Sequence, residues 1–180
     1  MSILDKMIAV VTPPESEEAR AEARQKAMSA AKPGNWLSQI LDHHREIEAR
    51  FADLRAATTA DARRVAQQEL ALILTGHSVA EESAIYPALA ADKQVGHAEL
   101  AYQEQSAAKM EMGLLERLDP LSQDYLDKVG HIEGAIAHHI YSEEADWFAE
   151  LAESASAAEQ ERMTRRYREE FDRYVGIGAI

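Results

Sequence analysis

The sequence predicts an all-α fold, an up-down-up-down antiparallel four-helix bundle with extra N-terminal and C-terminal helices. Two observations lead to this prediction. Alanine, glutamate, leucine and arginine are abundant, while the 180 residues include only 8 glycines and 5 prolines, a composition typical of helical proteins. Four long segments also repeat apolar residues every three or four positions, and the short connections between them favour antiparallel packing of neighbouring helices.

Residues 1–34 are predicted to form an N-terminal appendage that is partly helical. Thr12 followed by Pro13 is typical of a helix start, with threonine as the N-cap and proline at the first helical position. The stretch 16–32 is rich in charged residues and alanine and has little apolar face, so we expect it to pack at the periphery. A Pro-Gly pair ends this segment, and Asn35 can cap the helix that follows.

The bundle itself is predicted to span residues 35–153. Pro87 is expected to kink or end the second helix, because proline lacks the amide hydrogen that a helix interior needs. Asp119 and Pro120 can restart the chain as N-cap and first-turn proline of the fourth helix. The four bundle helices are expected at about 36–57, 60–91, 96–118 and 120–153.

Residues 154–180 are predicted to form a C-terminal helix that lies against the outside of the bundle. Arginine and glutamate recur there three and four positions apart, which is the spacing of ion pairs on an exposed helix face.

The composition argues against several classes of function. The chain has no cysteine, which excludes disulfides, iron–sulfur ligation and thiol catalysis and favours a cytoplasmic location. Its formal net charge of −13 repels phosphate backbones and anionic lipids, so neither nucleic acid nor a membrane is expected as a partner. No apolar run approaches the length of about 18 residues that spans a membrane. Residues 1–11 also lack the basic start and clean apolar stretch of a signal peptide.

Two segments of the chain repeat one pattern of histidine and glutamate. Glu81 follows His77 by four residues, and Glu143 follows His139 by four; in both segments a second glutamate comes next and an apolar–aromatic pair follows. Residues four apart on a helix face the same way, with Cβ atoms about 5–6 Å apart. A histidine nitrogen and a carboxylate oxygen can then reach one ion, and a carboxylate can bridge two. Each repeat therefore predicts one terminal nitrogen ligand and one bridging carboxylate.

Two further histidines are expected on the remaining helices. His44 falls in the apolar stripe of the first helix, and His97 precedes Leu100 by three residues near the start of the third. A lone histidine on such a stripe is more often a core residue than a ligand. Four inward histidines together with Glu81 and Glu143 are different, because buried carboxylates without a lysine or arginine beside them need a cation. The set fits two ions, with open positions for water or a small ligand.

These motifs resemble the hemerythrin-like, or HHE cation-binding, family over about residues 36–152. The pattern runs His-x-x-Ile/Val on the first helix, His-x-x-x-Glu-Glu followed by Tyr-Pro on the second, His-x-x-Leu on the third and His-His-x-x-x-Glu-Glu on the fourth. The resemblance implies a cofactor of two iron ions, oxo- or hydroxo-bridged. Imidazole and carboxylate also suit manganese and zinc, which we rank below iron. Carried over position by position, the resemblance makes the metal ligands His44, His77, Glu81, His97, His139 and Glu143.

The sequence departs from the oxygen-carrying members of the family on the third helix. Those proteins use a fifth histidine one turn from another, whereas Lys93 and Ala101 stand one turn to either side of His97. Glu104, seven residues after His97, faces the same way and is our predicted replacement ligand, directly or through water. The alternative for Glu104 is a role as hydrogen-bond acceptor behind the ligands. Reversible oxygen carriage is put in question by this difference.

The register within the two His-His pairs stays open. His43 takes the position of an aspartate that is usual in the family, so His44 is the predicted ligand of the first pair. His138 could pair with the glutamate five residues later, but the internal repeat favours His139. His131 is interpreted as lining the cavity or facing solvent.

The predicted function is metal binding, through a non-heme di-iron site that takes up oxygen, nitric oxide or iron for sensing, storage or scavenging. The alternative is a di-iron enzyme that acts on peroxide or nitric oxide, or donates iron for the repair of iron centres. The expected partner is a small diatomic ligand or peroxide, and the sequence identifies no redox partner. Tyr86, Tyr102 and Tyr141 could donate hydrogen bonds to a bound ligand or could simply pack in the core.

Overall fold

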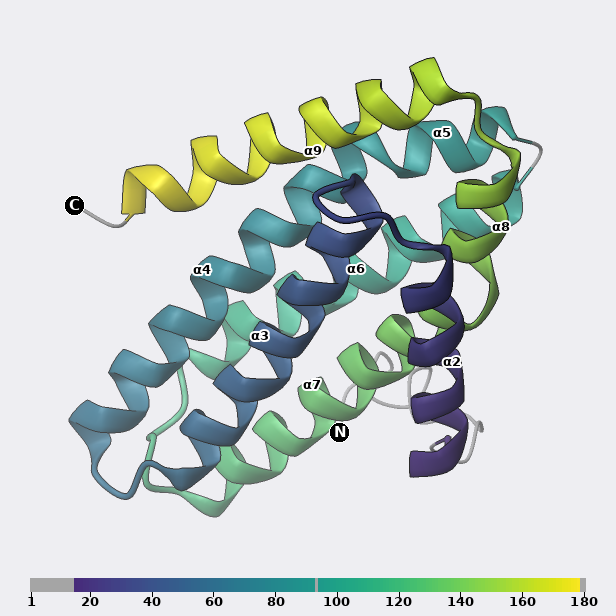
Figure 1. The fold of residues 1–180 in the computed structure, drawn as a ribbon. Helices are drawn as coiled ribbons and strands as arrows, with labels where there is room; N and C mark the ends of the chain where they lie inside the picture. The colour runs from purple at the N-terminus through teal and green to yellow at the C-terminus, as the bar shows by residue number, and fades with distance from the viewer. Residues whose placement is uncertain (1–14, 93, 179–180) are drawn as a thin grey trace.

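The computed structural model describes residues 15–92 and 94–178, and this part of the chain is built from helices alone (Figure 1). The all-α prediction is confirmed. No helix in the described ranges is long and apolar enough to cross a membrane. The elements are α2 (Glu17–Ala30), α3 (Trp36–Ala56), α4 (Ala60–Ala84), α5 (Tyr86–Ala91), α6 (Val95–Leu115), α7 (Gln123–Ser142), the π-helical turn η1 (Glu143–Trp147), α8 (Phe148–Ser154) and α9 (Ala157–Gly178).

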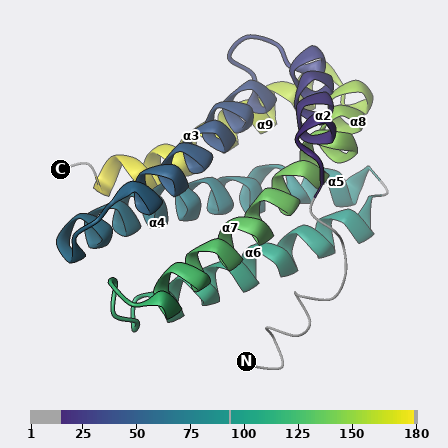
Figure 2. The same ribbon diagram turned by 90° about the horizontal axis from the view of Figure 1, so that it is seen from below.

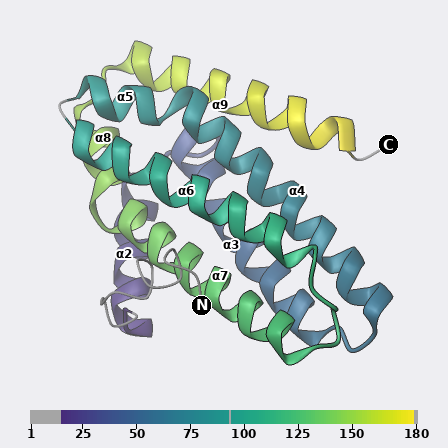
Figure 3. The same cartoon turned by 180° about the vertical axis from the view of Figure 1, so that it is seen from behind.

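Four long helices, α3, α4, α6 and α7, lie side by side and form the body of the protein (Figure 1, Figure 3). Helix α3 packs against α4 and α7, and α6 also packs against α4 and α7. The four helices therefore close around a common interior. Short connections at 57–59 and 116–122 return the chain between α3 and α4 and between α6 and α7.

Two outer helices cover this body from different sides. Helix α9 runs along α4 and also contacts α3 (Figure 1). Helix α2 lies across the end of α7 at η1 and contacts α3 and α8, as the view from below shows (Figure 2). Segments from both ends of the chain thus pack against the same body, close to the junctions where α4 and α7 end.

Polar caps set the helix starts. The Asn35 side chain accepts a hydrogen bond from the Ser38 amide at 2.9 Å, so the predicted cap of α3 is confirmed. Helix α2 begins behind Ser16, whose hydroxyl accepts a hydrogen bond from the Ala19 amide. The helix start predicted at Thr12 lies outside the described residues.

The fourth long helix starts later than predicted. Helix α7 begins at Gln123 rather than at Asp119 and Pro120. The Ser122 hydroxyl accepts a hydrogen bond from the Tyr125 amide and acts as the N-cap. The Asp119 carboxylate instead accepts one from a backbone amide two residues on, so it stabilises the preceding turn.

The second long helix ends where its proline predicts. Helix α4 stops at Ala84, and α5 starts at Tyr86 with Pro87 in its first turn. Because proline has no amide hydrogen, the helical hydrogen-bond ladder cannot continue through it. The Tyr86 side chain beside this break is fully buried.

The end of the fourth long helix is not the regular helix to Glu153 that was predicted. The π-helical turn Glu143–Trp147 interrupts it, and α8 follows. A π turn widens the helix locally and is frequent at functional sites. Neighbouring residues on a regular helix face different directions. In this turn, by contrast, Glu143 and Glu144 are both buried, with 0% and 2% of their surface exposed.

Two apolar clusters fill the interior, and a layer of buried polar side chains lies between them. One cluster, which includes Trp36 and Phe148, lies toward α5, α8 and α9. The other, which includes Phe51 and Leu70, lies toward the far ends of the long helices. The residues between the clusters, called the polar layer below, are His44, His77, Glu81, Gln105, His139, Glu143 and Glu144.

The second cluster offers a test of packing that is separate from the polar layer. Leu70 is fully buried two helical turns before His77. We expect Leu70→Ala to lower the free energy of unfolding by about 2–5 kcal/mol, because it leaves a cavity. Urea titration followed by circular dichroism measures this change. Bound metal at full occupancy should be unaffected, and an unchanged unfolding midpoint would contradict the burial of Leu70.

Candidate metal centre

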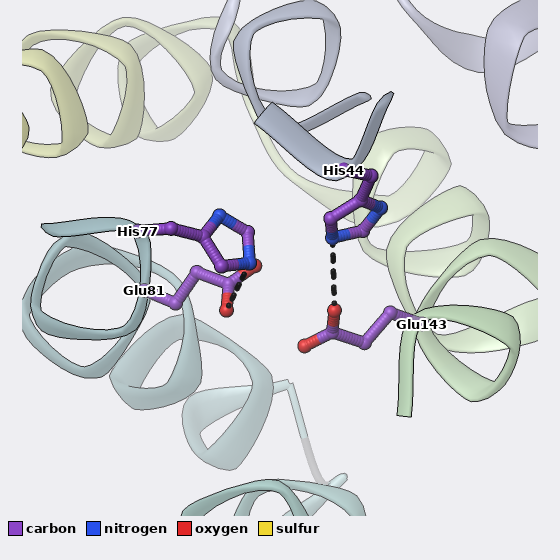
Figure 4. A group of neighbouring side chains, drawn as sticks. All are labelled: His44, His77, Glu81 and Glu143. Carbon is purple, nitrogen blue, oxygen red and sulfur yellow. Dashed lines mark ion pairs between the residues drawn. The ribbon is translucent and has the colours of Figure 1, made fainter. Parts of the chain in front are cut away.

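Four side chains of the polar layer converge on one small space. His44 comes from α3, His77 and Glu81 come from α4, and Glu143 comes from η1. Each offers one ligand atom, and these atoms all lie within 4.8 Å of one another. Figure 4 shows the four side chains pointing toward a common centre. All four are at least 98% buried, so the space is shielded from bulk water.

The repeated His-x-x-x-Glu spacing places each histidine against its own glutamate. His77 Nε2 lies 3.2 Å from Glu81 Oε2, and His139 Nε2 lies 3.2 Å from Glu143 Oε1. Glu143 also faces the first helix, because its Oε2 lies 3.3 Å from His44 Nε2. The two oxygens of Glu143 are therefore directed at histidines on two different helices.

Three buried polar atoms of these four residues have no hydrogen-bond partner. They are His44 Nε2, Glu81 Oε1 and Glu143 Oε2. Buried polar groups are almost always paired, so three orphaned atoms in one place require an explanation. No lysine or arginine among the described residues forms an ion pair with Glu81 or Glu143. A cation held by imidazole and carboxylate would supply the missing partner, and these residues fit that role.

The two buried glutamates hold unequal charges in the absence of a cation. Burial and the neighbouring Glu143 raise the pKa of Glu81 to about 8. Burial also acts to raise the pKa of Glu143, but His139 and His44 outweigh it and bring that pKa well below its usual range. At neutral pH the metal-free protein therefore keeps a proton on Glu81, which a metal ion must displace to bind there.

An outer partner holds the second nitrogen of each inward imidazole. His44 Nδ1 lies 2.8 Å from Glu144 Oε1, His77 Nδ1 lies 3.0 Å from the Tyr167 hydroxyl, and His139 Nδ1 lies 2.8 Å from Glu104 Oε2. An imidazole that offers Nε2 to a cation carries its proton on Nδ1 and donates it to these oxygens. Such contacts fix the tautomer and the ring orientation of metal-binding histidines.

Helix α2 reaches the centre through one of these outer partners. The Arg24 guanidinium donates to both oxygens of Glu144 at 3.0 Å. It also donates to Glu48 on α3 at 2.8 Å. Arg24 therefore holds the carboxylate that orients His44 and ties the N-terminal helix to the centre.

Three of the predicted ligands, His97, Glu104 and His139, lie outside the group of four donors, although His139 still faces Glu143. His97 stands in the first turn of α6, where its ring stacks on Trp147 with centroids 5.0 Å apart and its Nδ1 lies 3.1 Å from Gln94 Oε1. The buried residues in this part of α6 are Ala98, Ala101 and Gln105. Glu104 faces His139 from behind, in the acceptor role that was its alternative.

The alternative histidines also lie away from the four donors. His43 Nδ1 lies 2.7 Å from the Tyr167 hydroxyl, and its ring stacks on Phe171. His138 is half-exposed, with Nδ1 2.6 Å from Glu15 Oε1. His131 is half-buried. Within both pairs, the structure directs the second histidine, His44 or His139, toward the glutamates.

Four contributors were not anticipated from the sequence. The sequence did contain an indication of Glu144, because it is the second glutamate of the repeat. Its counterpart Glu82 instead forms an ion pair with Lys109, so the repeat alone does not predict burial. Gln105, Arg24 and Tyr167 carried no motif, and their roles depend on how α6, α2 and α9 pack.

The fold and these donors together define a helical protein with a candidate cation-binding centre. The chain belongs to the hemerythrin family, because the family described as "Hemerythrin HHE cation binding domain" matches residues 37–173. The resemblance read from the motifs is confirmed, and the metal-binding character of the domain follows from it. The match extends through most of α9, so that Tyr167 falls within it.

A stretch of 95 residues is 25% identical to a protein named DNA nickase from Nostoc sp. (strain PCC 7120 / SAG 25.82 / UTEX 2576). The match covers 53% of this chain and 27% of that protein, so the chain corresponds to about a quarter of its relative's length. No solved structure matches the chain.

The pKa shifts predict how pH affects the metal-free protein. The pKa of Glu81 is raised from 4.5 to about 8, mainly by burial. The pKa of His44 is raised from 6.5 to about 9, because Glu143 and Glu144 outweigh its burial. Groups with raised pKa values stabilise the fold at low pH and lose that contribution as the pH passes the folded-state value. The pKa values of His77 and Glu143 are lowered, so these two groups do not change the stability of the fold further above pH 6.5.

We therefore expect the melting temperature of the metal-free protein to fall between pH 6.5 and 9. Metal needs deprotonated ligands, so the gain in melting temperature on adding metal should be larger at pH 8 than at pH 6. Thermal melts with and without chelator measure both quantities. The variant Glu81→Gln, which cannot titrate at that position, should show a shallower fall. A metal-free melting temperature that rises over this interval would contradict the assignment.

Proposed function

We propose that this protein is a hemerythrin-like four-helix bundle that holds two bridged iron ions. The observation that carries the proposal is the buried Glu143 carboxylate. One of its oxygens faces His44 at 3.3 Å and the other faces His139 at 3.2 Å. Two nitrogen donors on opposite sides of one carboxylate suit two ions joined by that carboxylate.

In this proposal the first ion is held by His44 and His77, and the second is held by His139. Glu81 and Glu143 supply oxygens to both. The orphaned Oε1 of Glu81 and Oε2 of Glu143 provide the donor atoms that remain. His97 is left out of the ligand set, and Glu104 acts through His139.

Iron is proposed over zinc and manganese. The donors are imidazole and carboxylate without thiolate, which suits all three metals. Structural zinc prefers a closed set of four ligands, whereas two bridged ions with few protein ligands leave positions open for an exogenous ligand. Bound iron would supply redox chemistry and affinity for small oxygen- and nitrogen-containing ligands.

Binding of a small ligand or of iron is favoured over turnover of an organic substrate. One surface cavity of about 550 Å³ is lined by α4, α5, α8 and α9, and another of about 410 Å³ is lined by α4, α6 and α9. Neither lining includes a residue of the polar layer. We therefore propose that the centre takes up oxygen, nitric oxide or iron for sensing, storage or scavenging. The DNA-nicking activity named for the Nostoc relative is not carried over, because a net charge of −13 repels DNA.

The stoichiometry of iron tests the proposal. Metal-free protein loaded with ferrous iron without oxygen should bind about two ions per chain. Glu143→Ala removes the bridging carboxylate and should reduce this to about one ion or fewer. His97→Ala is the matched control and should keep both. Iron measured against protein concentration gives the result, and two ions in Glu143→Ala would show that this carboxylate does not bridge.

Turnover separates the carrier from the enzyme. The iron-loaded protein is mixed with an excess of hydrogen peroxide or nitric oxide, and consumption is followed over time. Uptake that stops at a fixed ratio to protein supports binding. Continued consumption would favour the alternative, a di-iron enzyme acting on peroxide or nitric oxide.

A further inference from the structure

The Tyr86 hydroxyl lies in the polar layer, on the side of the centre where His139 stands. It is 2.9 Å from Glu143 Oε1, 3.0 Å from Glu81 Oε2 and 3.3 Å from His139 Nε2. The whole residue is buried, with 0% of its surface exposed. Tyr86 therefore faces one atom from each of the three residues that are proposed to hold the second ion.

The break before Pro87 puts the side chain there. On a continuous helix, a residue five positions after Glu81 would lie about 140° away around the axis. Because α4 ends at Ala84 and α5 starts afresh at Tyr86, the phenol can turn back toward Glu81. The helix breaks here because Pro87 has no amide hydrogen to continue α4.

A protonated phenol cannot satisfy two ionised carboxylates at once. It has one hydrogen to donate, yet carboxylate oxygens of both Glu81 and Glu143 lie within hydrogen-bond distance. The Gln105 amide already donates to the phenol oxygen at 2.6 Å and to Glu81 Oε2 at 2.6 Å. Without metal, the proton that Glu81 keeps can fill the remaining oxygen–oxygen contact. Metal binding displaces that proton, and the contact between the two oxygens then needs a cation in its place.

The spacing of these atoms fits neighbouring ligands of one ion. Donors about 2.1 Å from a six-coordinate ion lie about 3 Å from one another. The distances from the phenol oxygen to its three neighbours are 2.9, 3.0 and 3.3 Å, and His139 Nε2 lies 3.2 Å from Glu143 Oε1. Helix α6 adds no histidine at this level, where Gln105 stands.

We propose that Tyr86, as a phenolate, is a ligand of the second ion, together with His139 and the two glutamates. The inference rests on the proposed di-iron site and adds to it. On binding, the O–H bond of Tyr86 breaks, the proton leaves to solvent and the oxygen pair bonds to the metal, without any change in oxidation state. The Gln105 amide continues to donate to the phenolate oxygen. An anionic oxygen ligand on one ion and two imidazoles on the other make the two positions unequal, and the phenolate position favours ferric iron.

The visible spectrum of the ferric protein tests this inference, because phenolate bound to ferric iron produces a charge-transfer band and phenolate ring modes in resonance Raman. The wild-type protein should show both signals. Tyr86→Phe should lose both, and its iron content should fall from about two ions to about one. Tyr102→Phe is the matched control. Its ring packs edge-on against Tyr86 and its hydroxyl donates to the Glu82 carbonyl, so it should keep the band and the iron.

The outcomes separate this inference from the di-iron proposal. Two irons per wild-type chain without phenolate signals would overturn the role of Tyr86 and leave the di-iron site intact. Fewer than two irons in the fully loaded wild-type protein would overturn both. Far-UV circular dichroism of Tyr86→Phe checks that it is helical. If Tyr86→Phe cannot be folded, the Raman signals of the wild-type protein alone decide, because isotopic labelling of tyrosine shifts them only when a tyrosine binds iron.

Discussion

The structure depends on the burial of two carboxylates that have, among the described residues, no lysine or arginine beside them to balance their charge. Glu81 and Glu143 are fully buried between two apolar clusters. Removing a carboxylate from water costs several kcal/mol unless its charge is compensated. The side chains that surround the pair are three imidazoles, a phenol and an amide, and without metal only His44 and His139 balance carboxylate charge, by taking up protons. A protein arranged in this way requires either protons or metal ions at its centre.

The outer elements of the chain support this centre. Helix α2 acts through Arg24 and Glu144 on His44, and α9 acts through Tyr167 on His77. Helix α6 supplies Glu104 behind His139. Segments that looked peripheral in the sequence therefore determine the orientation of the histidines. Metal binding and the docking of α2 and α9 should be coupled, because each stabilises the ring positions that the other uses.

How much of the centre the sequence predicts depends on how far apart the contacting residues lie along the chain. The i, i+4 repeat is local, and it correctly anticipated that each glutamate faces its histidine. The third helix was harder, because the placement of His97 depended on Leu100 as an inward neighbour. Leu100 is 42% exposed, and α6 also carries exposed Met110 and Leu114, so its apolar residues do not mark its buried face. Single-sequence periodicity is not informative on such a helix.

Two further features could not be read from local patterns. The π-helical turn that buries Glu144 beside Glu143 reflects the packing of α7 against its neighbours, not an identifiable motif. Tyr167 lies on a helix whose sequence is dominated by surface charge, and it reaches His77 only because α9 packs along α4. Long-range packing of this kind sets the contacts behind the candidate ligands, while the two His-x-x-x-Glu pairs follow from spacing along one helix.

The most direct test of a two-ion centre is a crystal structure of the iron-loaded protein with anomalous scattering measured at the iron edge. Two peaks are expected in the polar layer, about 3.5–4 Å apart. One should lie beside His44 and His77 and the other beside His139, with Glu143 between them. Iron found only at carboxylates on the surface, with no peak between Glu81 and Glu143, would contradict a two-ion centre.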